Sequence, residues 1–210
     1  MSVPVIVFAK APVAGLAKTR LIPALGEEGA AALAARLLRH TLVQAVAADI
    51  GPVELCVTPD AGHPLLHTAA QEFGATLSNQ GDGDLGERMH RALARRLETA
   101  EAALLIGTDA PSLDAARLRE AATALANHDA VFVPALDGGY ALVGLRRPAP
   151  HCFLNLRWSH DRVMADTRAR LAQDGLRWAE LGPVADIDRP EDLIQLPPSW
   201  PEHGGQAGRA

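Results

Sequence analysis

Cysteine and aromatic residues are scarce in this chain of 210 residues. The two cysteines, Cys56 and Cys152, are too few for a disulfide scaffold and show no metal-ligand spacing. With three tryptophans, one tyrosine and four phenylalanines, the core has to be built from Ala, Leu and Val. Hydrophobic residues make up 48% of the chain, which is enough for one sizeable core. We therefore expect one folded domain without disulfides, in which Cys56 packs as a small hydrophobe in a strand.

Long apolar runs and an excess of positive charge are also missing. No segment reaches the length of a membrane span, and the N-terminus lacks a basic region followed by a long apolar one. The net charge of −5 and the pI near 5.9 argue against a general binder of nucleic acid or membrane surfaces. We expect a cytoplasmic protein without nucleic-acid or membrane partners, in which any phosphate site is local.

Short apolar runs alternate with segments of helical periodicity, which is typical of βαβ units around a mostly parallel sheet. Strands are predicted at residues 3–8, 53–58, 75–77, 103–106, 131–134, 141–145 and 178–181. Helices are predicted at residues 27–47, 84–99, 114–127 and 161–175, and a short one from Pro190. The predicted fold class is α/β, a three-layer sandwich with a mostly parallel sheet.

The predicted domain covers residues 1–196. Residues 197–210, "PPSWPEHGGQAGRA", are rich in Pro and Gly and lack periodicity, so we expect a disordered tail. In open α/β sheets, ligands bind beyond the carboxyl ends of the strands. Polar stretches follow several of the predicted strands at this edge, and these stretches carry the candidate site residues.

The loop after the first strand, "KAPVAGLAKTR", contains Lys10, Gly15, Lys18 and Arg20. It resembles a P-loop only in part, because Ala17 stands where that motif has the glycine before its lysine. The loop is therefore either a phosphate-binding turn of another kind or an ordinary basic loop.

Asp109 follows the apolar run "ALLIG", where a buried strand ends. A carboxylate at this position is well placed to hold Mg²⁺, which is usually bound by one or two carboxylates plus substrate phosphates. The alternative is that Asp109 only satisfies turn amides before the next helix. The residue by itself favours neither reading.

Asp186 and Asp188 lie two residues apart in "ADIDRPEDL", so in an extended segment both face the same side. Two carboxylates facing together are costly unless a cation or hydrogen-bond donors neutralise them. Taken alone, the motif slightly favours a structural reading, in which Asp188 caps the following helix and Asp186 is solvated.

Two glycine-containing stretches complete the candidate site. Asp137, Gly138 and Gly139 lie between two apolar runs and predict a hairpin, and the glycines also let backbone approach a ligand. In "QGDGDLGERM", a flexible loop leads into a helix N-terminus, which favours anions, at Gly86, Glu87 and Arg88. Asp84 and Glu87 have the spacing of a capping box.

Together these stretches resemble a known family, over about residues 3–196. The segments that carry the resemblance are "VFAKAPVAGLAKTRLIPALGEEGAAALAARLL", "GDLGERM", "GTDAPSL", "DGGYALVGL" and "DIDRPEDL". They are similar to transferases found beside radical-SAM or selenium-related proteins, of the arsenosugar-biosynthesis glycosyltransferase type, in the nucleotide-diphospho-sugar transferase superfamily with its GT-A fold. The first and last segments are also similar to phospholactate guanylyltransferase and, more distantly, to molybdenum-cofactor guanylyltransferases.

The resemblance implies a nucleotide over the first loop, with Lys18 and Arg20 on its phosphates. It implies a divalent metal, Mg²⁺ or Mn²⁺, held by Asp109 with Asp186 or Asp188. It also implies that Asp137, Gly138 and Gly139 line the acceptor or sugar side. The chain departs from the pattern at Thr108-Asp109-Ala110, where many glycosyltransferases have Asp-X-Asp, and at Trp158-Ser159-His160, where relatives tend to read Trp-Ser-Thr.

Three functions stay open at this point. The first is metal-dependent glycosyl transfer from a nucleoside-diphosphate sugar to a small-molecule acceptor, in which Asp137 orients or deprotonates the acceptor. The second is nucleotidyl transfer from an NTP to a phosphorylated small molecule, with release of pyrophosphate. The third is a non-catalytic nucleotide-binding protein of the same fold. The oligomeric state is open as well, a homodimer being one alternative.

Overall fold

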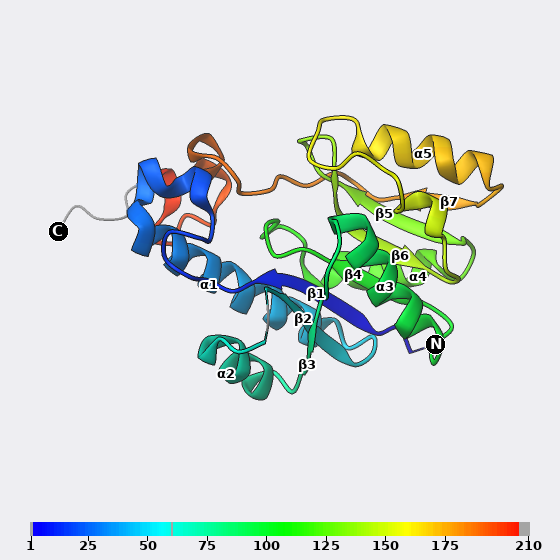
Figure 1. Cartoon of the computed structure of the whole chain (residues 1–210), viewed down its shortest axis with the longest axis horizontal. Helices are drawn as coiled ribbons and strands as arrows, with labels where there is room; N and C mark the ends of the chain where they lie inside the picture. The colour runs from blue at the N-terminus through cyan, green and yellow to red at the C-terminus, as the bar shows by residue number, and fades with distance from the viewer. Residues whose placement is uncertain (1, 60, 206–210) are drawn as a thin grey trace.

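The computed structural model describes residues 2–59 and 61–205, which form one seven-stranded sheet between two layers of helices (Figure 1). The strand order is β3-β2-β1-β4-β6-β5-β7. All neighbouring strands pair in parallel except β6, which runs antiparallel to β4 and β5. The strands are β1 Val5–Lys10, β2 Val53–Thr58, β3 Thr76–Asn79, β4 Ala103–Ile106, β5 Ala130–Pro134, β6 Tyr140–Leu145 and β7 Trp178–Glu180.

The helices cover both faces of the sheet. The α-helices are α1 Ile22–Ala48, α2 Pro64–Glu72, α3 Leu85–Leu97, α4 Ala115–Ala124 and α5 Val163–Gln173. The short 3₁₀-helices are η1 Thr19–Leu21, η2 Pro150–Cys152, η3 Pro190–Gln195 and η4 His203–Gly205. Apolar side chains of α1, α2 and α4 pack on one face, and those of α3 and α5 pack on the other. The predicted three-layer α/β sandwich is therefore confirmed.

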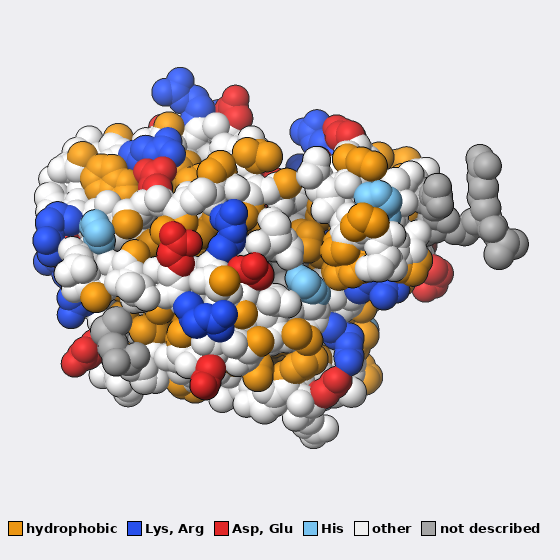
Figure 2. Space-filling model, turned by 180° about the vertical axis from the view of Figure 1, so that it is seen from behind, with side chains coloured by type: hydrophobic (Ala, Val, Ile, Leu, Met, Phe, Trp, Pro, Cys, Tyr) orange, Lys and Arg blue, Asp and Glu red, His pale blue; other side chains and the backbone are white. Residues whose placement is uncertain are grey.

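The strands are buried on both faces, as their unbroken apolar runs predict. In β1, for example, Val5 and Val7 contact the α1, α2 and α4 layer, whereas Ile6 and Phe8 contact the α3 and α5 layer. Cys56 is fully buried in β2, which confirms that it packs as a small hydrophobe. No helix in residues 2–59 or 61–205 is long and apolar enough to cross a membrane. Figure 2 shows charged side chains of both signs interspersed over the face turned away from the view of Figure 1.

Helix caps match the sequence in two places. Asp84 and Glu87 form the predicted capping box of α3, each side chain accepting a hydrogen bond from the backbone N–H of the other. Asp114 caps α4 by accepting from the N–H of Arg117 at 2.9 Å. The last predicted helix, from Pro190, is the 3₁₀-helix η3 rather than an α-helix.

One helix begins earlier than predicted, and one helix was not predicted at all. α1 begins at Ile22, five residues before the predicted start, with a break at Gly26, whose φ of 73° is non-helical. The apolar periodicity begins only after that break, so it predicts the second part alone. α2 was not predicted, because its nine residues are short and its N-terminal cap is His63, whose ring nitrogen accepts from the N–H of Leu65 at 3.3 Å. Histidine is not among the residues that usually mark a helix start.

Residues 197–205 are packed on α1, where the composition predicted a disordered tail. The ring of Trp200 meets that of His40 edge-on at 5.4 Å, and the Arg36 guanidinium lies 5.7 Å from the Trp200 ring. Glu202 is 3% exposed and accepts a hydrogen bond from Arg36 Nε at 3.3 Å. In this part the structure differs from the disordered tail that the composition predicts, because Trp200 and Glu202 attach the segment to α1. Residues 206–210 of the predicted tail lie outside the described residues.

A buried carboxylate joins β2, β3 and α3. Glu54 is 1% exposed and accepts hydrogen bonds from Ser78 on β3 and from Arg95 and Arg96 at the end of α3. A buried carboxylate is tolerated only when donors surround it, as these three side chains do. The group therefore fixes α3 against the edge of the sheet.

We predict that Glu54→Ala lowers the free energy of unfolding by about 3 kcal/mol, because it removes one partner of a buried ion-pair group. Chemical denaturation followed by circular dichroism measures the change. The matched control is Glu72→Ala, which removes an exposed carboxylate paired with Arg39 and should change stability little. Equal effects of the two substitutions would contradict the claim that Glu54 stabilises the fold more than Glu72 does.

Candidate functional site

Lys18 connects three loops at the carboxyl edge of the sheet. It lies between β1 and η1 in the left-handed conformation, with φ 47°. Its Nζ lies 2.6 Å from Asp109 Oδ1 and donates a hydrogen bond to the carbonyl oxygen of Ile187. These two contacts use two of the three ammonium donors of Lys18, and its side chain is only 8% exposed. The role of Lys18 on the phosphates of a nucleotide stays a prediction, and in the structure Lys18 holds the edge together.

The segment around Ile187 crosses the end of β4. The backbone N–H of Ile187 donates to the carbonyl oxygen of Asp109 at 2.8 Å, next to the contact made by Lys18. The Ile187 side chain is fully buried in a small cluster with Leu21, Leu33 and neighbouring apolar residues of α1 and η3. In Figure 1 this segment runs in orange from β7 to the amino-terminal turns of α1. The structure thus brings Lys18, Asp109 and the Asp186–Asp188 segment together, as the sequence predicts.

The other cations of the first loop are more exposed. Arg20 forms an ion pair with Asp188, and both side chains remain open to solvent, 63% and 36% exposed respectively. Lys10, the last residue of β1, donates from Nζ to the carbonyl oxygen of Leu16 at 2.8 Å. Gly15 has φ 74°, a conformation that favours glycine in this turn. Because these contacts are at the surface, Arg20 and Lys10 can exchange them for an anionic ligand at little cost.

The hairpin between β5 and β6 lies beside the segment that contains Asp186 and Asp188. Asp137 Oδ1 accepts from the N–H of Gly139 at 2.8 Å, and Gly138 has φ 93°, so the predicted Asp-Gly-Gly turn is confirmed. The pKa of Asp186 is raised above its usual value, first by burial and then by the negative charges of Asp137 and Asp188. The negative charge of Asp137 therefore acts on Asp186.

The residues at the start of α3 are engaged in contacts within the protein. Glu87 is engaged in the capping box, and Arg88 donates to Gln80 Oε1 at 3.0 Å and to the carbonyl oxygen of Asp84 at 3.2 Å. Gly86 is a packing residue, since a Cβ there would lie 2.6 Å from Trp158 Nε1. These contacts give all three residues structural roles, and their predicted role in binding the nucleotide stays a prediction.

Gln80 is a polar residue that the sequence did not single out. It is 5% exposed, and its Nε2 donates to the carbonyl oxygens of Ala9 at 3.3 Å and Cys56 at 3.1 Å, at the ends of β1 and β2. It also accepts from Arg88, so it joins α3 to β1 and β2. A single glutamine before the loop glycines forms no sequence pattern that would have predicted this role.

The predicted metal ligands do not form a ready-made metal centre. Among residues 2–59 and 61–205 there is no group of three or more His, Cys, Asp or Glu side chains that could hold a metal ion. One oxygen of Asp109 contacts Lys18, and Asp188 contacts Arg20. Asp109 is nevertheless 51% exposed. The arrangement fits an open site of one or two carboxylates completed by substrate phosphates, and not a closed protein cage.

The cysteines are not candidate nucleophiles. Both are buried, and burial raises the pKa of the Cys152 thiol to about 11 and also raises that of Cys56. At neutral pH both are therefore protonated and unreactive.

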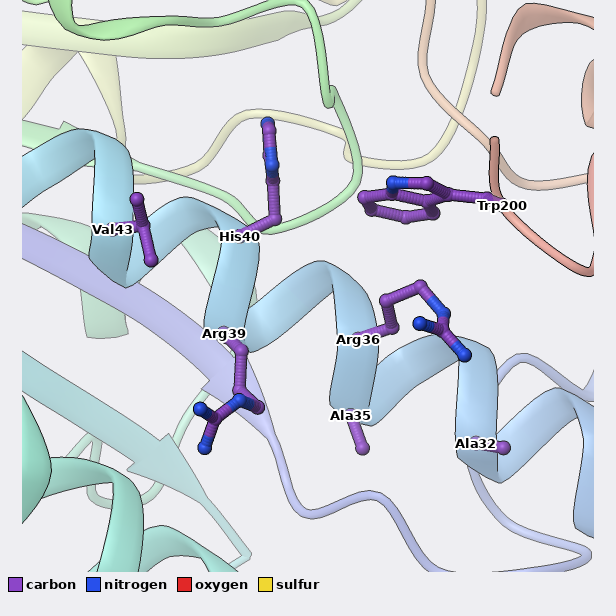
Figure 3. A pocket seen from close by; sticks show the side chains of 7 residues that line it. All are labelled: Ala32, Ala35, Arg36, Arg39, His40, Val43 and Trp200. Carbon is purple, nitrogen blue, oxygen red and sulfur yellow. The ribbon is translucent and has the colours of Figure 1, made fainter. Parts of the chain in front are cut away.

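Two surface hollows lie away from the predicted site. The first, of about 350 Å³, lies along the outer side of α1 next to Trp200 (Figure 3) and is lined by Ala32, Ala35, Arg36, Arg39, His40, Val43 and Trp200. The second, of about 430 Å³, includes Arg177 and Trp178 where β7 begins, at the opposite edge of the sheet. Neither is lined by a residue of the predicted site.

Solved structures with the same fold are known. The chain has a TM-score of 0.85 and 26% identity to a protein of Desulfovibrio desulfuricans G20 that is provisionally described as a nucleotide-diphospho-sugar transferase, covering 98% of this chain and 93% of that one. A nucleotidyl transferase of Methanothermobacter thermautotrophicus has a TM-score of 0.63 at 13% identity, with coverage of 93% and 95%. Glucosyl-3-phosphoglycerate synthase of Mycobacterium tuberculosis, solved with Mn²⁺, UDP and glucosyl-3-phosphoglycerate, has a TM-score of 0.52 at 14% identity, with coverage of 92% and 75%.

These similarities establish the nucleotide-diphospho-sugar transferase type of fold that the motifs predicted. A comparison with curated protein sequences finds no match. A model of a bacterial protein family matches residues 37–160, which is more than half of the chain and runs from α1 to the loop before α5. The specific arsenosugar-biosynthesis type is not distinguished by this match. The chain belongs to the family described as "Uncharacterized protein conserved in bacteria (DUF2064)".

Proposed function

We propose that this protein is a metal-dependent transferase that uses a nucleotide-activated donor, and specifically that it transfers a glycosyl group from a nucleoside-diphosphate sugar to a small-molecule acceptor. The observation that carries the proposal is the meeting of Lys18, Asp109 and the Asp186–Asp188 segment at the carboxyl edge. Ligands of open α/β sheets bind at that edge. The fold shared with the Desulfovibrio protein supports the same class of donor.

Positive charge at this edge suits a diphosphate leaving group. In glycosyl transfer from such a donor, negative charge grows on the departing diphosphate in the transition state, and fixed cations stabilise it there. Lys18 is held in place by two partners, and Arg20 lies on the exposed side of the same loop. Arg20 would leave Asp188 and contact the diphosphate, because a surface ion pair is weak.

A divalent ion, Mg²⁺ or Mn²⁺, would be held by the exposed Asp109 with Asp188 or Asp186, the donor's phosphates completing its coordination. When bound, such an ion supplies additional positive charge at the diphosphate. The synthase of similar fold that was solved with Mn²⁺ and UDP supports this part of the proposal. Asp137, whose negative charge acts on Asp186, would orient an acceptor hydroxyl.

Nucleotidyl transfer is the second candidate, and the similarity to the Methanothermobacter nucleotidyl transferase favours it. The same residues would serve this reaction. A phosphorylated acceptor would attack the α-phosphorus of an NTP, and Lys18 and Arg20 would stabilise the released pyrophosphate. The two candidates differ in the donor, so a binding experiment separates them.

We predict that a nucleoside-diphosphate sugar raises the melting temperature in the presence of Mg²⁺ or Mn²⁺ more than any NTP does. At a hundred times its dissociation constant a ligand adds about 2.7 kcal/mol to stability, which is a visible shift. Thermal unfolding with a panel of NTPs, NDPs and NDP-sugars, each with and without metal, measures it. A larger effect of NTPs would instead favour nucleotidyl transfer, and no effect of any nucleotide would favour a non-catalytic protein.

We predict that Asp109→Asn lowers metal-dependent kcat by at least about a hundredfold while leaving the fold intact, because it removes a charge that the metal requires. Initial rates of nucleotide release at several metal concentrations measure the effect. The matched control is Asp49→Asn, an exposed residue at the end of α1. Unchanged activity of the Asp109 variant would refute its role as a metal ligand.

We predict that Lys18→Ala weakens nucleotide binding by about tenfold or more, the usual loss when a charged hydrogen bond is removed. Arg146→Ala, at the opposite edge where β6 ends, should leave binding unchanged. Isothermal titration with the best nucleotide of the panel measures both variants. Each variant is first compared with the unmutated protein by circular dichroism, since Lys18 also connects loops. Equal binding losses would mean that the first loop is not the phosphate site.

A further inference from the structure

β6 enters the sheet through a β-bulge next to the Asp-Gly-Gly turn. Val133 pairs with Leu142, but the following residue of β5, Pro134, pairs with Tyr140. Ala141 is therefore an extra residue without an opposite partner. Bulges of this kind change the direction of a side chain and are common beside active sites.

The bulge turns Tyr140 towards the α3 and α5 layer. Side chains alternate along a strand, so without the bulge Tyr140 would share the face of Leu142, which packs in the α1, α2 and α4 layer. Instead its ring packs in the other layer, edge-on to Phe132 at 5.2 Å and to Trp158 at 6.2 Å between ring centroids. Three aromatic rings therefore gather in a chain that has only eight Phe, Trp and Tyr residues.

Two hydrogen-bond donors in this aromatic group have no partner. Among the described residues, three buried side-chain polar atoms lack a hydrogen bond, and two of them are Tyr140 Oη and Trp158 Nε1. A buried donor without an acceptor costs free energy, and nearly all such groups in folded proteins are paired. Burial also raises the pKa of Tyr140, so its hydroxyl stays protonated as a donor. Two such donors in one aromatic group make it a candidate place for a ligand that accepts hydrogen bonds.

Both donors lie at the carboxyl edge of the sheet. Tyr140 directly follows the turn that contains Asp137, and the negative charge of Asp137 acts on Asp186 of the proposed donor site. Trp158 packs on Gly86 in the first turn of α3, where the missing Cβ leaves room for the indole. The aromatic group therefore lies at the same edge of the sheet as the proposed donor site.

Trp158 is carried by an irregular loop, and a ligand reaches its buried Nε1 only if this loop moves. Residues 154–162, between η2 and α5, form neither helix nor strand. Asn155 and Ser159, on either side of Trp158, have φ values of 56° and 63°, a conformation that is unfavourable for residues with a side chain. One end is held by Arg170, which donates to the carbonyl oxygens of Leu154 and Asn155 at 2.7 Å. We call this segment the Trp158 loop.

We propose that Tyr140 and Trp158 form the acceptor site, and that the Trp158 loop opens to admit a neutral hydroxylated small molecule, a sugar or a polyol. The term acceptor rests on the proposed function. Oxygens of the ligand accept hydrogen bonds from Tyr140 Oη and Trp158 Nε1, and its carbon faces pack against the rings. Both donors are uncharged and surrounded by aromatic carbon, where a phosphate or carboxylate would be poorly solvated.

The test uses the full-length protein labelled with ¹⁵N. Its three tryptophans give three indole N–H resonances, and the one from Trp158 is identified by its loss in Trp158→Phe. The protein is titrated with D-glucose, with glycerol and, as a charged comparison, with inorganic phosphate, each with and without UDP and Mn²⁺. We expect D-glucose or glycerol to shift the Trp158 resonance and to leave those of Trp178 and Trp200 in place. A shift with phosphate alone, or with none of the three compounds, overturns the proposal.

The variant Tyr140→Phe separates recognition from a structural role. It removes a hydroxyl that has no partner, so the melting temperature should stay the same or rise, while affinity for the neutral ligand falls by about tenfold. Trp178→Phe is the matched control for the tryptophan, because its Nε1 already donates to Glu180 at 2.9 Å. Unchanged affinity in Tyr140→Phe overturns the role of Tyr140.

The donor side is read independently on the same samples. Stabilisation by UDP with Mn²⁺ should be equal in the unmutated protein and in Tyr140→Phe. A donor effect without any response of Trp158 refutes the acceptor site alone. A response of Trp158 without any nucleotide effect refutes the proposed function and leaves a binding site for neutral hydroxylated compounds.

Discussion

The contacts of one ammonium group hold the carboxyl edge of this protein together. Lys18 reaches Asp109 after β4 and the carbonyl oxygen of Ile187 near the end of the chain, which are 91 and 169 residues away in sequence. Loop ends that are free to move separately are thereby held at one point. Because Lys18 is nearly buried, water competes little for its donors, and the ion pair is stronger than one at the surface.

Apolar packing supports this polar connection from behind. Ile187, Leu193 and Leu196 are buried against the first turns of α1, and Trp200 continues the contact along the helix. The C-terminal segment is therefore a structural part of the site rather than an appendage. Its position brings Asp186 and Asp188 to the edge, where Asp188 pairs with Arg20 and the negative charge of Asp137 acts on Asp186.

The site has two sides that differ in chemistry. Around Lys18 and Arg20 it is charged and partly open to solvent, which suits phosphates and a divalent ion. Around Tyr140 and Trp158 it is aromatic, with donors that carry no charge. Asp137 lies in the hairpin turn directly before Tyr140, and its role toward an acceptor is a proposal.

The sequence by itself determined the features that depend on neighbouring residues. Unbroken apolar runs predicted the strands, the Asp137–Gly139 turn predicted the hairpin, and the Asp84 cap predicted the start of α3, because each is decided by local backbone conformation and burial. Only the tertiary structure decided which partners Lys18 has, that Trp200 docks on α1, and that a bulge turns Tyr140 to the other face. These depend on contacts between residues far apart in the chain, and composition and periodicity do not record them.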